Sequence, residues 1–138
     1  MAYNSVQQIQ MRIAQRLGHE CVIQTYIASS IRLVDYTILC RALRVPGTTF
    51  LEDVPRSGPI GLTDADIRQR IIRYLRRKAT TQEELAKRVG VNRRTVSRWL
   101  SGVTAFRLRD YIDVCDALKV RHTFFFEWEM TDYYDNNY

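Results

Sequence analysis

The apolar residues in the middle of the chain repeat with the period of a helix. Ile67, Ile71, Tyr74 and Leu75 are spaced by three and four residues, behind Thr63, whose side chain can cap a first turn. This pattern predicts an amphipathic helix directly after Thr63. Its other faces carry a run of basic residues: Arg70, Arg73, Arg76, Arg77 and Lys78. Such a run forms either a soluble face or a contact with a neighbouring phosphate strand, and the sequence favours neither.

Two shorter helices are expected next. The first begins at Thr80 or Thr81 and ends at Gly90, and the second begins after Asn92 and ends at Gly102. Thr and Asn side chains accept hydrogen bonds from the free amides of a first helical turn, and glycine readily adopts the left-handed conformation that ends a helix. The turn between the two helices is therefore tight.

A fourth helix is expected from about 107 to 118, because apolar residues again follow the helical period. After it the period changes to two. The alternation within 123–130 predicts a short β-strand, with a short helix as the competing interpretation. Residues 48–54 are the expected pairing partner, since an exposed apolar edge seeks another strand. The polar, acidic and aromatic tail, 131–138, is expected to be frayed or loosely docked.

The first half of the chain resembles the second. Residues 31–52 align without gaps with residues 106–127 at an offset of 75, and 11 of these 22 positions are identical. Shorter matches pair 13–18 with 85–90, and 23–29 with 96–102. Repeated units usually bury a face against each other. The sequence therefore predicts two related halves that pack together or on a second chain.

The clearest break in the chain is "VPRSGPIGLTD", which contains two prolines and two glycines. It divides the chain into four expected parts: a degenerate first copy within 1–54 (the repeat itself at about 5–53), a linker at 55–62, the main helical domain at 63–130, and the acidic tail at 131–138.

The stretch 83–102 has the residues that two short helices need when they cross at a tight turn. Such a pair requires a small residue at the crossing, apolar residues toward a core, and a turn residue with unusual backbone angles. These positions are filled by Leu85, Ala86, Val89, Gly90, Val91, Val96 and Trp99. Trp99 is expected in the core rather than stacked on a base. The stretch resembles the helix-turn-helix of the phage repressor family, the lambda repressor and Cro type, also called Xre-like.

The resemblance covers residues 63 to about 120 and implies a fold that is mainly α, with lambda repressor-like helix-turn-helix domains, here duplicated within one chain. In that family the second motif helix enters the major groove, and the preceding helix directs its N-terminus at phosphate. The residues that the resemblance places near bases or the DNA backbone are Gln82, Asn92, Arg93, Arg94, Thr95, Arg98 and Arg107.

The distribution of charge agrees with this implication. The chain has 21 Lys and Arg against 15 Asp and Glu, and 14 of the basic residues lie within 63–120. Arginine supplies 18 of the 21, which favours bidentate contacts with phosphate or guanine. Arg93, Arg94 and Arg98 share one exposed helix edge with no acid between them, whereas the aligned stretch 19–30 has no arginine.

These features predict a sequence-specific transcriptional regulator that binds double-stranded DNA. One reading helix covers only part of a typical site, so a homodimer on two half-sites is expected. Two alternatives remain open. Both halves of one chain could bind DNA as an internal pseudo-dimer, or the chain could be a protein-interaction module, such as an antitoxin or anti-activator, whose N-terminal half contacts a protein partner.

Other classes of function find little support. No catalytic or phosphate-loop constellation is visible, so an enzyme is not expected, and neither is a cofactor. Cys21, Cys40 and Cys115 are widely spaced, with His19 and His122 as the only histidines, so no metal site is expected. Cys40 and Cys115 are expected to fill the core. The chain shows neither a membrane span nor a signal peptide, so we expect a cytoplasmic protein.

Overall fold

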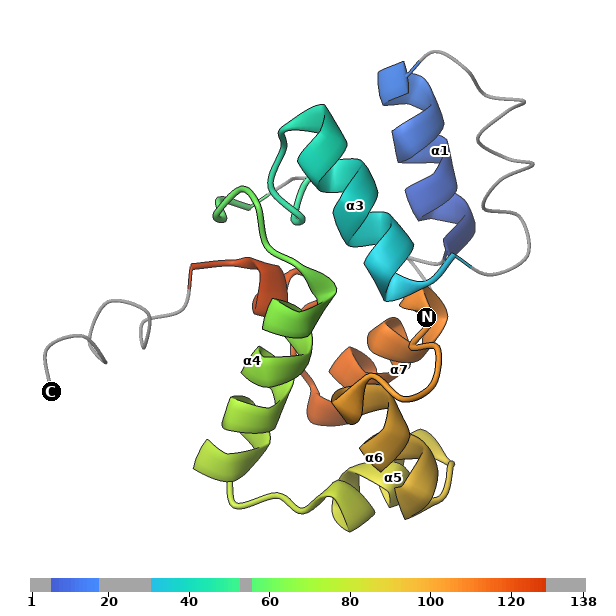
Figure 1. The fold of residues 1–138 in the computed structure, drawn as a ribbon, viewed down its shortest axis with the longest axis vertical. Coiled ribbons are helices and arrows are strands. Elements are labelled where there is room, and N and C mark those ends of the chain that lie inside the picture. Colours follow the sequence, from blue (N-terminus) through green and yellow to red (C-terminus); the bar gives the residue numbers. More distant parts are fainter. Residues whose placement is uncertain (1–5, 18–30, 53–55, 129–138) are drawn as a thin grey trace, which may run out of the picture.

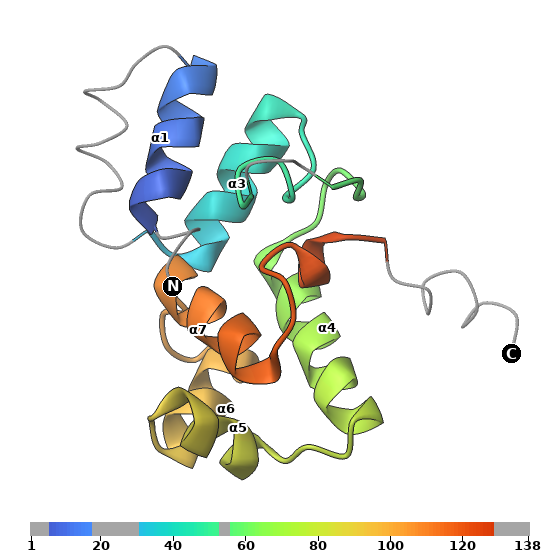
Figure 2. The ribbon, with the colours of Figure 1, turned by 180° about the vertical axis from the view of Figure 1, so that it is seen from behind.

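The computed structural model describes residues 6–17, 31–52 and 56–128, and these ranges form a helical fold (Figure 1). Its elements are α1 (Val6–Leu17), α3 (Leu33–Leu43), α4 (Asp64–Arg77), α5 (Gln82–Val89), α6 (Arg93–Ser101), α7 (Leu108–Leu118) and the 3₁₀ helix η1 (Phe124–Phe126). Helices α1 and α3 lie at one end of the molecule, α5 and α6 at the other, and α4 runs along one side (Figures 1 and 2). The mainly α fold is confirmed.

The helix boundaries in the second half follow the capping residues. The side chains of Thr63, Thr81 and Asn92 accept hydrogen bonds from the backbone N–H three residues ahead, at 3.2, 3.1 and 2.9 Å. Gly90 and Gly102 end α5 and α6 with φ of 94° and 81°. The four helices predicted downstream of the linker are therefore confirmed, each to within about a residue.

The two predicted β-strands are wrong for the residues that the structure describes. Thr48 to Leu51 form successive turns, with the N–H of Thr49 donating to the carbonyl of Pro46 at 3.1 Å. Residues 124–126 form the 3₁₀ helix, because the two neighbours Phe125 and Phe126 are both fully buried. A strand would direct neighbouring side chains to opposite faces. Residues 53, 54, 129 and 130 lie outside the described residues.

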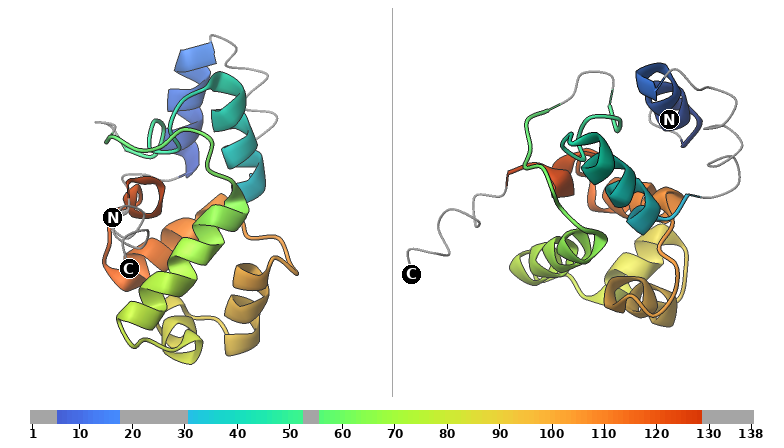
Figure 3. Two further views of the ribbon diagram at one scale, coloured as in Figure 1. Left: turned by 60° about the vertical axis from the view of Figure 1, so that its left-hand side comes forward. Right: turned by 45° about the horizontal axis from the view of Figure 1, so that its top comes forward.

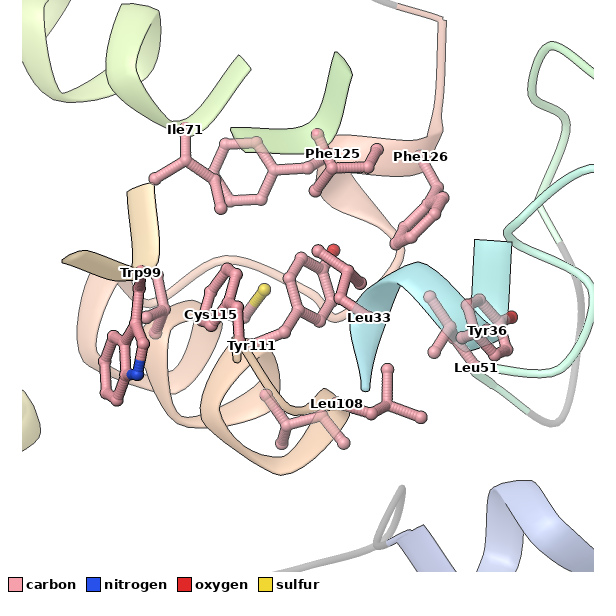
Figure 4. Close-up of a cluster of buried hydrophobic side chains, with 14 of the residues drawn as sticks. Leu33, Tyr36, Leu51, Ile71, Trp99, Leu108, Tyr111, Cys115, Phe125 and Phe126 are labelled. Carbon is pink, nitrogen blue, oxygen red and sulfur yellow. The ribbon is translucent and has the colours of Figure 1, made fainter. Parts of the chain in front are cut away.

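A single apolar core joins the two halves of the chain (Figure 4). Phe126 lies at its centre, with the ring of Tyr36 edge-on at a centroid distance of 5.7 Å and the ring of Tyr111 edge-on at 5.5 Å. Cys40 and Cys115 are buried in the same cluster, and burial raises the pKa of the Cys40 thiol to about 12. Both cysteines act as small apolar side chains, as the sequence predicts.

The sequence places Arg70 on an outer face of α4, but in the structure its side chain is buried. Its side chain is buried because it lies on the same helix face as Ile67 and Ile71, and its Nη1 donates to the carbonyls of Phe125 and Glu127 at 3.2 and 2.6 Å. These carbonyls end the 3₁₀ helix and need donors in a buried place. Arg70 thus has a structural role, while Arg76 and Arg77 are exposed.

Within the described ranges, the helices are too short or too polar to cross a bilayer.

The contacts of Glu127 predict that part of the free energy of unfolding is lost in acid. Burial raises the pKa of its carboxyl, but hydrogen bonds from Arg121 (2.6 Å) and Thr123 (2.5 Å) outweigh it and leave that pKa below 4.5. A lowered folded-state pKa gives stability that is present above the unfolded value and lost as the pH falls through the folded value. We expect Glu127→Gln to reduce the free energy of unfolding at neutral pH, and the deficit to shrink toward pH 3.

Urea unfolding of both proteins across this pH range measures the difference directly. Asp35 and Glu84 also have lowered pKa values, but they titrate in both proteins and cancel in the comparison. A deficit that stays constant with pH would contradict the assignment to Glu127.

Candidate nucleic-acid interface

Helices α5 and α6 cross at a tight turn. The N–H groups of Gly90 and Val91 both donate to the carbonyl of Ala86, at 2.8 and 3.0 Å, and so end α5 and turn the chain toward Asn92. The apolar positions of the motif face inward: Leu85, Ala86, Val96 and Trp99 are buried, and Val89 and Val91 pack partly buried against the core. Packing therefore determines which side of α6 faces solvent.

Trp99 belongs to the core side of α6. Its indole is 6% exposed and stacks on Phe106 with a centroid distance of 5.3 Å and an interplanar angle of 21°. This leaves little of the ring to stack on a base. Phe106 lies in the loop between α6 and α7, so the same contact holds that loop against the helix.

The solvent side of α6 carries the arginines. Arg93 and Arg94 occupy its first turn, Arg98 follows one turn later, and all three are exposed. Within the part of the chain that the structure describes, no hydrogen bond or ion pair engages these three guanidinium groups. A planar donor fork without an internal partner is suited to bind carboxylate, phosphate or a guanine edge.

Asn92 and Thr95 form hydrogen bonds mainly with each other. The Oδ1 atom of Asn92 accepts from the backbone N–H of Thr95 at 2.9 Å and from its hydroxyl at 3.1 Å. This cap fixes the first turn of α6, from which Arg93 and Arg94 extend. The remaining donor capacity of Asn92 is its amide nitrogen, which is exposed with the rest of the side chain.

The start of α5 lies beside the start of α6. Gln82, the first residue of α5, lines a shallow hollow together with Thr81, Glu83 and Arg93. Arg107 lies past the opposite end of α6, exposed at the cap of α7. The structure thus brings Gln82 and Arg93 together and places Arg107 at the far end of the helix.

Residues 71–125 match a family model described as Helix-turn-helix. This part of the chain is similar to helix-turn-helix domains of the lambda repressor-like, Xre type. The match begins within α4, contains α5, α6 and α7, and ends in η1. No curated protein and no solved structure matches the chain. A match of this kind suggests a DNA-binding regulator.

Sequence reasoning missed Arg68, which supports the end of α6. Its Nη2 lies 3.1 Å from Asp64, and its Nη1 donates to the carbonyl of Leu100 at 3.4 Å. A cation at a helix C-terminus is favourable because the last carbonyls carry partial negative charge. The acid–base pair four residues apart at the start of α4 was the available signal. Arg68 therefore links α4 to the helix-turn-helix motif.

The surroundings of Gly102 predict that alanine destabilises the domain more at this position than at Gly90. An added Cβ would lie 2.7 Å from Nη1 of Arg68, so the guanidinium would have to leave Leu100. The left-handed φ costs about 1–2 kcal/mol at either glycine, and at Gly102 the loss of the long, weak hydrogen bond between Arg68 and Leu100 adds about 0.5 kcal/mol. We expect Gly102→Ala to destabilise the domain more than Gly90→Ala, which has a similar φ and no neighbour within 4 Å.

Thermal or urea unfolding of the two variants measures this difference. Adding Arg68→Ala to each should bring the two glycine substitutions closer together, since the guanidinium is then absent. Equal costs at Gly90 and Gly102 in the otherwise unchanged protein would contradict the role of Arg68.

Proposed function

We propose that this protein is a sequence-specific regulator that places α6 in the major groove of double-stranded DNA. The observation that carries the proposal is the exposure of Arg93, Arg94 and Arg98 on the solvent side of the second motif helix, without partners among the described residues. The fold does not require arginine there, because none of the three supports the core or a cap.

Each part of the motif then has a role at the DNA. The side chains of Arg93, Arg94 and Arg98 lie against base edges or flanking phosphates, and a bidentate arginine–guanine pair gives about 1–3 kcal/mol of discrimination. We therefore expect at least one G·C pair at the base positions that α6 contacts. Gln82, at the positive N-terminal end of α5, contacts the DNA backbone.

Asn92, Thr95 and Arg107 complete the proposed contact surface. Asn92 and Thr95 hold the first turn of α6 through their mutual hydrogen bonds. From there they contact the DNA strand that Arg93 and Arg94 approach. Arg107 contacts a phosphate beyond the other end of α6. A cytoplasmic location, where the chain meets DNA, is part of this proposal.

The proposal also concerns the number of chains that bind one DNA site. The sequence predicts a homodimer on two half-sites, with the internal pseudo-dimer as its rival. Helix α6 alone reaches about half of a typical site, which supports some second contribution. The packing of the N-terminal half against the helix-turn-helix domain instead favours a single chain on the DNA.

Selection of bound duplexes from a random pool tests the proposed function. We expect enrichment of a short motif that contains G·C pairs, and an affinity that falls steeply with salt concentration, because bound phosphates release counterions. Binding titrations with enriched and scrambled duplexes then give the specificity ratio. Equal binding of all duplexes, or none, would contradict the proposal and favour the protein-interaction module.

A further inference from the structure

The two halves of the chain meet through a reciprocal pair of backbone hydrogen bonds. The N–H of Leu33 donates to the carbonyl of Phe106 at 2.8 Å, and the N–H of Leu108 donates to the carbonyl of Ile31 at 2.9 Å. Between these bonds Arg32 faces Arg107 in an antiparallel β-bridge. The start of α3 therefore lies directly against the loop that precedes α7 (Figure 3).

The paired residues are equivalent in the aligned halves. Ile31, Arg32 and Leu33 correspond to residues 106, 107 and 108 at the offset of 75. Each bond from the first half to the second is thus matched by a bond between the equivalent atoms in the reverse direction. Reciprocal contacts of this kind are what two identical subunits form across a two-fold axis.

The correspondence extends to side chains. The hydroxyl of Tyr36 donates to the carbonyl of Gly47 at 2.5 Å, and the hydroxyl of Tyr111 donates to the carbonyl of His122 at 2.6 Å. Both acceptors lie eleven residues after their tyrosine. Because the same tyrosine fastens the same downstream turn in each half, the two segments have the same local architecture.

The helix ends correspond as well. Arg44 and Lys119 end α3 and α7 in the left-handed conformation, each with φ of 58°. The next residue in each half donates its N–H to the carbonyl of the core cysteine, Cys40 or Cys115, at 3.0 Å. Helix α4 ends in the same way, with Ala79 left-handed and the N–H of Thr80 donating to the carbonyl of Leu75 at 2.9 Å, so these caps agree with the repeat but do not require it.

We propose that the N-terminal half occupies the place of a second subunit on the pairing edge of the helix-turn-helix domain. The pairing edge is defined here as residues 106–108, together with the buried faces of Tyr111 and Phe126. The chain is therefore monomeric when free. It also binds DNA as a single chain with one reading helix, a statement that rests on the proposed function.

The internal arrangement excludes a second copy from this edge. Leu33, Tyr36 and Leu108 are buried with Tyr111 and Phe126, so the contact is dry. Two segments on one chain meet at an effective concentration of about a millimolar for a short flexible connection. A second copy would offer the same backbone groups, so at micromolar protein concentration the internal partner is favoured.

The two halves differ in the residues that would read DNA. The first-half stretch 19–30, which corresponds to the region of α6, contains one acid and no arginine, and it lies outside the described residues. A single reading helix and a non-reading partner produce an asymmetric operator. An inverted repeat is not expected.

A cross-link across the bridge tests the internal pairing. Opposed residues between the two hydrogen bonds of an antiparallel bridge have Cα atoms about 4.5 Å apart, within the range of about 4.4–6.8 Å that a disulfide requires. The variant carries Arg32→Cys and Arg107→Cys in a Cys21→Ser background. Arg32 and Arg107 are exposed, so both substitutions leave the core unchanged. The two single-cysteine variants, also with Cys21→Ser, are the matched controls.

After mild oxidation, we expect an intrachain disulfide in the double variant, with faster migration on a non-reducing gel and a thermal midpoint above that of its reduced form. Light scattering of the unmodified full chain is expected to give 16.3 kDa. An interchain disulfide, no disulfide at all, or twice the monomer mass at micromolar concentration would each overturn the proposal.

The DNA experiments separate this inference from the proposed function. With the selected duplex, one bound chain and an asymmetric protected region support the inference, and two chains on an inverted repeat overturn it. If no duplex is bound, the proposed function fails, while the disulfide and the mass of the free chain still decide the inference. Arg107→Cys removes a proposed phosphate contact, so DNA affinity is measured only on the unmodified chain.

Discussion

Replacing Arg93 and Arg94 by alanine is expected to weaken duplex binding by roughly 5- to 150-fold per arginine, corresponding to about 1–3 kcal/mol each. The physical reason is the loss of two planar donor groups from the first turn of the helix that faces solvent. The salt dependence should become shallower by about one unit of slope for each lost phosphate contact. The fold should remain, since both side chains are exposed and neither caps a helix.

Fluorescence anisotropy with the selected duplex at several salt concentrations measures both effects. The matched control is Arg44→Asn with Lys119→Asn, which removes two positive charges from other helix ends and keeps a residue that tolerates the left-handed conformation. We expect this control to lose far less affinity. If the Arg93 and Arg94 variant kept the affinity and salt slope of the unmodified protein, α6 would not be the reading helix.

Substitution by lysine separates the contacts to bases from those to phosphates. Arg94→Lys keeps the charge and loses the planar fork, so a phosphate contact should survive largely intact while a bidentate guanine contact should not. A loss of specificity between the enriched and scrambled duplexes, at nearly constant salt slope, would assign Arg94 to a base. The same exchange at Arg98 provides the comparison one turn along the helix.

Phe126→Ala is expected to reduce the free energy of unfolding by about 3–5 kcal/mol, which is the usual cost of removing a fully buried phenylalanine. Its ring contacts both Tyr36 and Tyr111, so the cavity opens between the two halves and not within one of them. Because domains of this size have about 5–15 kcal/mol of stability in total, such a loss approaches the limit of folding.

Chemical unfolding followed by far-ultraviolet circular dichroism and by tryptophan fluorescence measures the loss. Phe124→Ala is the matched control, since Phe124 is only half-buried against Tyr74 on the outer side of η1, and it should cost clearly less. The two probes should report one transition, because the core is continuous. Similar costs for the two phenylalanines would contradict the central position of Phe126.

The local features of the fold could be predicted from the sequence, because they depend on neighbouring residues. Thr63 and Asn92 cap helices through bonds to amides three residues away, and Gly90 ends α5 whatever packs around it. The strand at 123–130 failed for the opposite reason. Phe125 and Phe126 are consecutive and both buried, because both rings contact Tyr111 of α7 while Phe125 also contacts α4 and Phe126 also contacts α3, and alternation along the chain does not reveal this.

In the candidate site, too, some features depend on neighbouring residues and others on distant contacts. The apolar positions of the motif predict which side of α6 faces solvent, so the exposure of Arg93, Arg94 and Arg98 could be expected. The buried position of Arg70 and the support of Leu100 by Arg68 depend on carbonyls that lie far away in the sequence. Composition alone treats all of these arginines alike, and only the packing of α4 separates the structural ones.

The position of Phe126 also has a consequence for the synthesis of the chain. The N-terminal half has left the peptidyl-transferase centre long before Phe126 is added, and at about 5–20 residues per second the delay is roughly 4–15 s. During this time Tyr36 lacks the ring of Phe126, and Leu33 also lacks its partner until Phe106 has been made. The order of translation thus leaves the apolar face of the first half open to chaperones and proteases until the second half has been made.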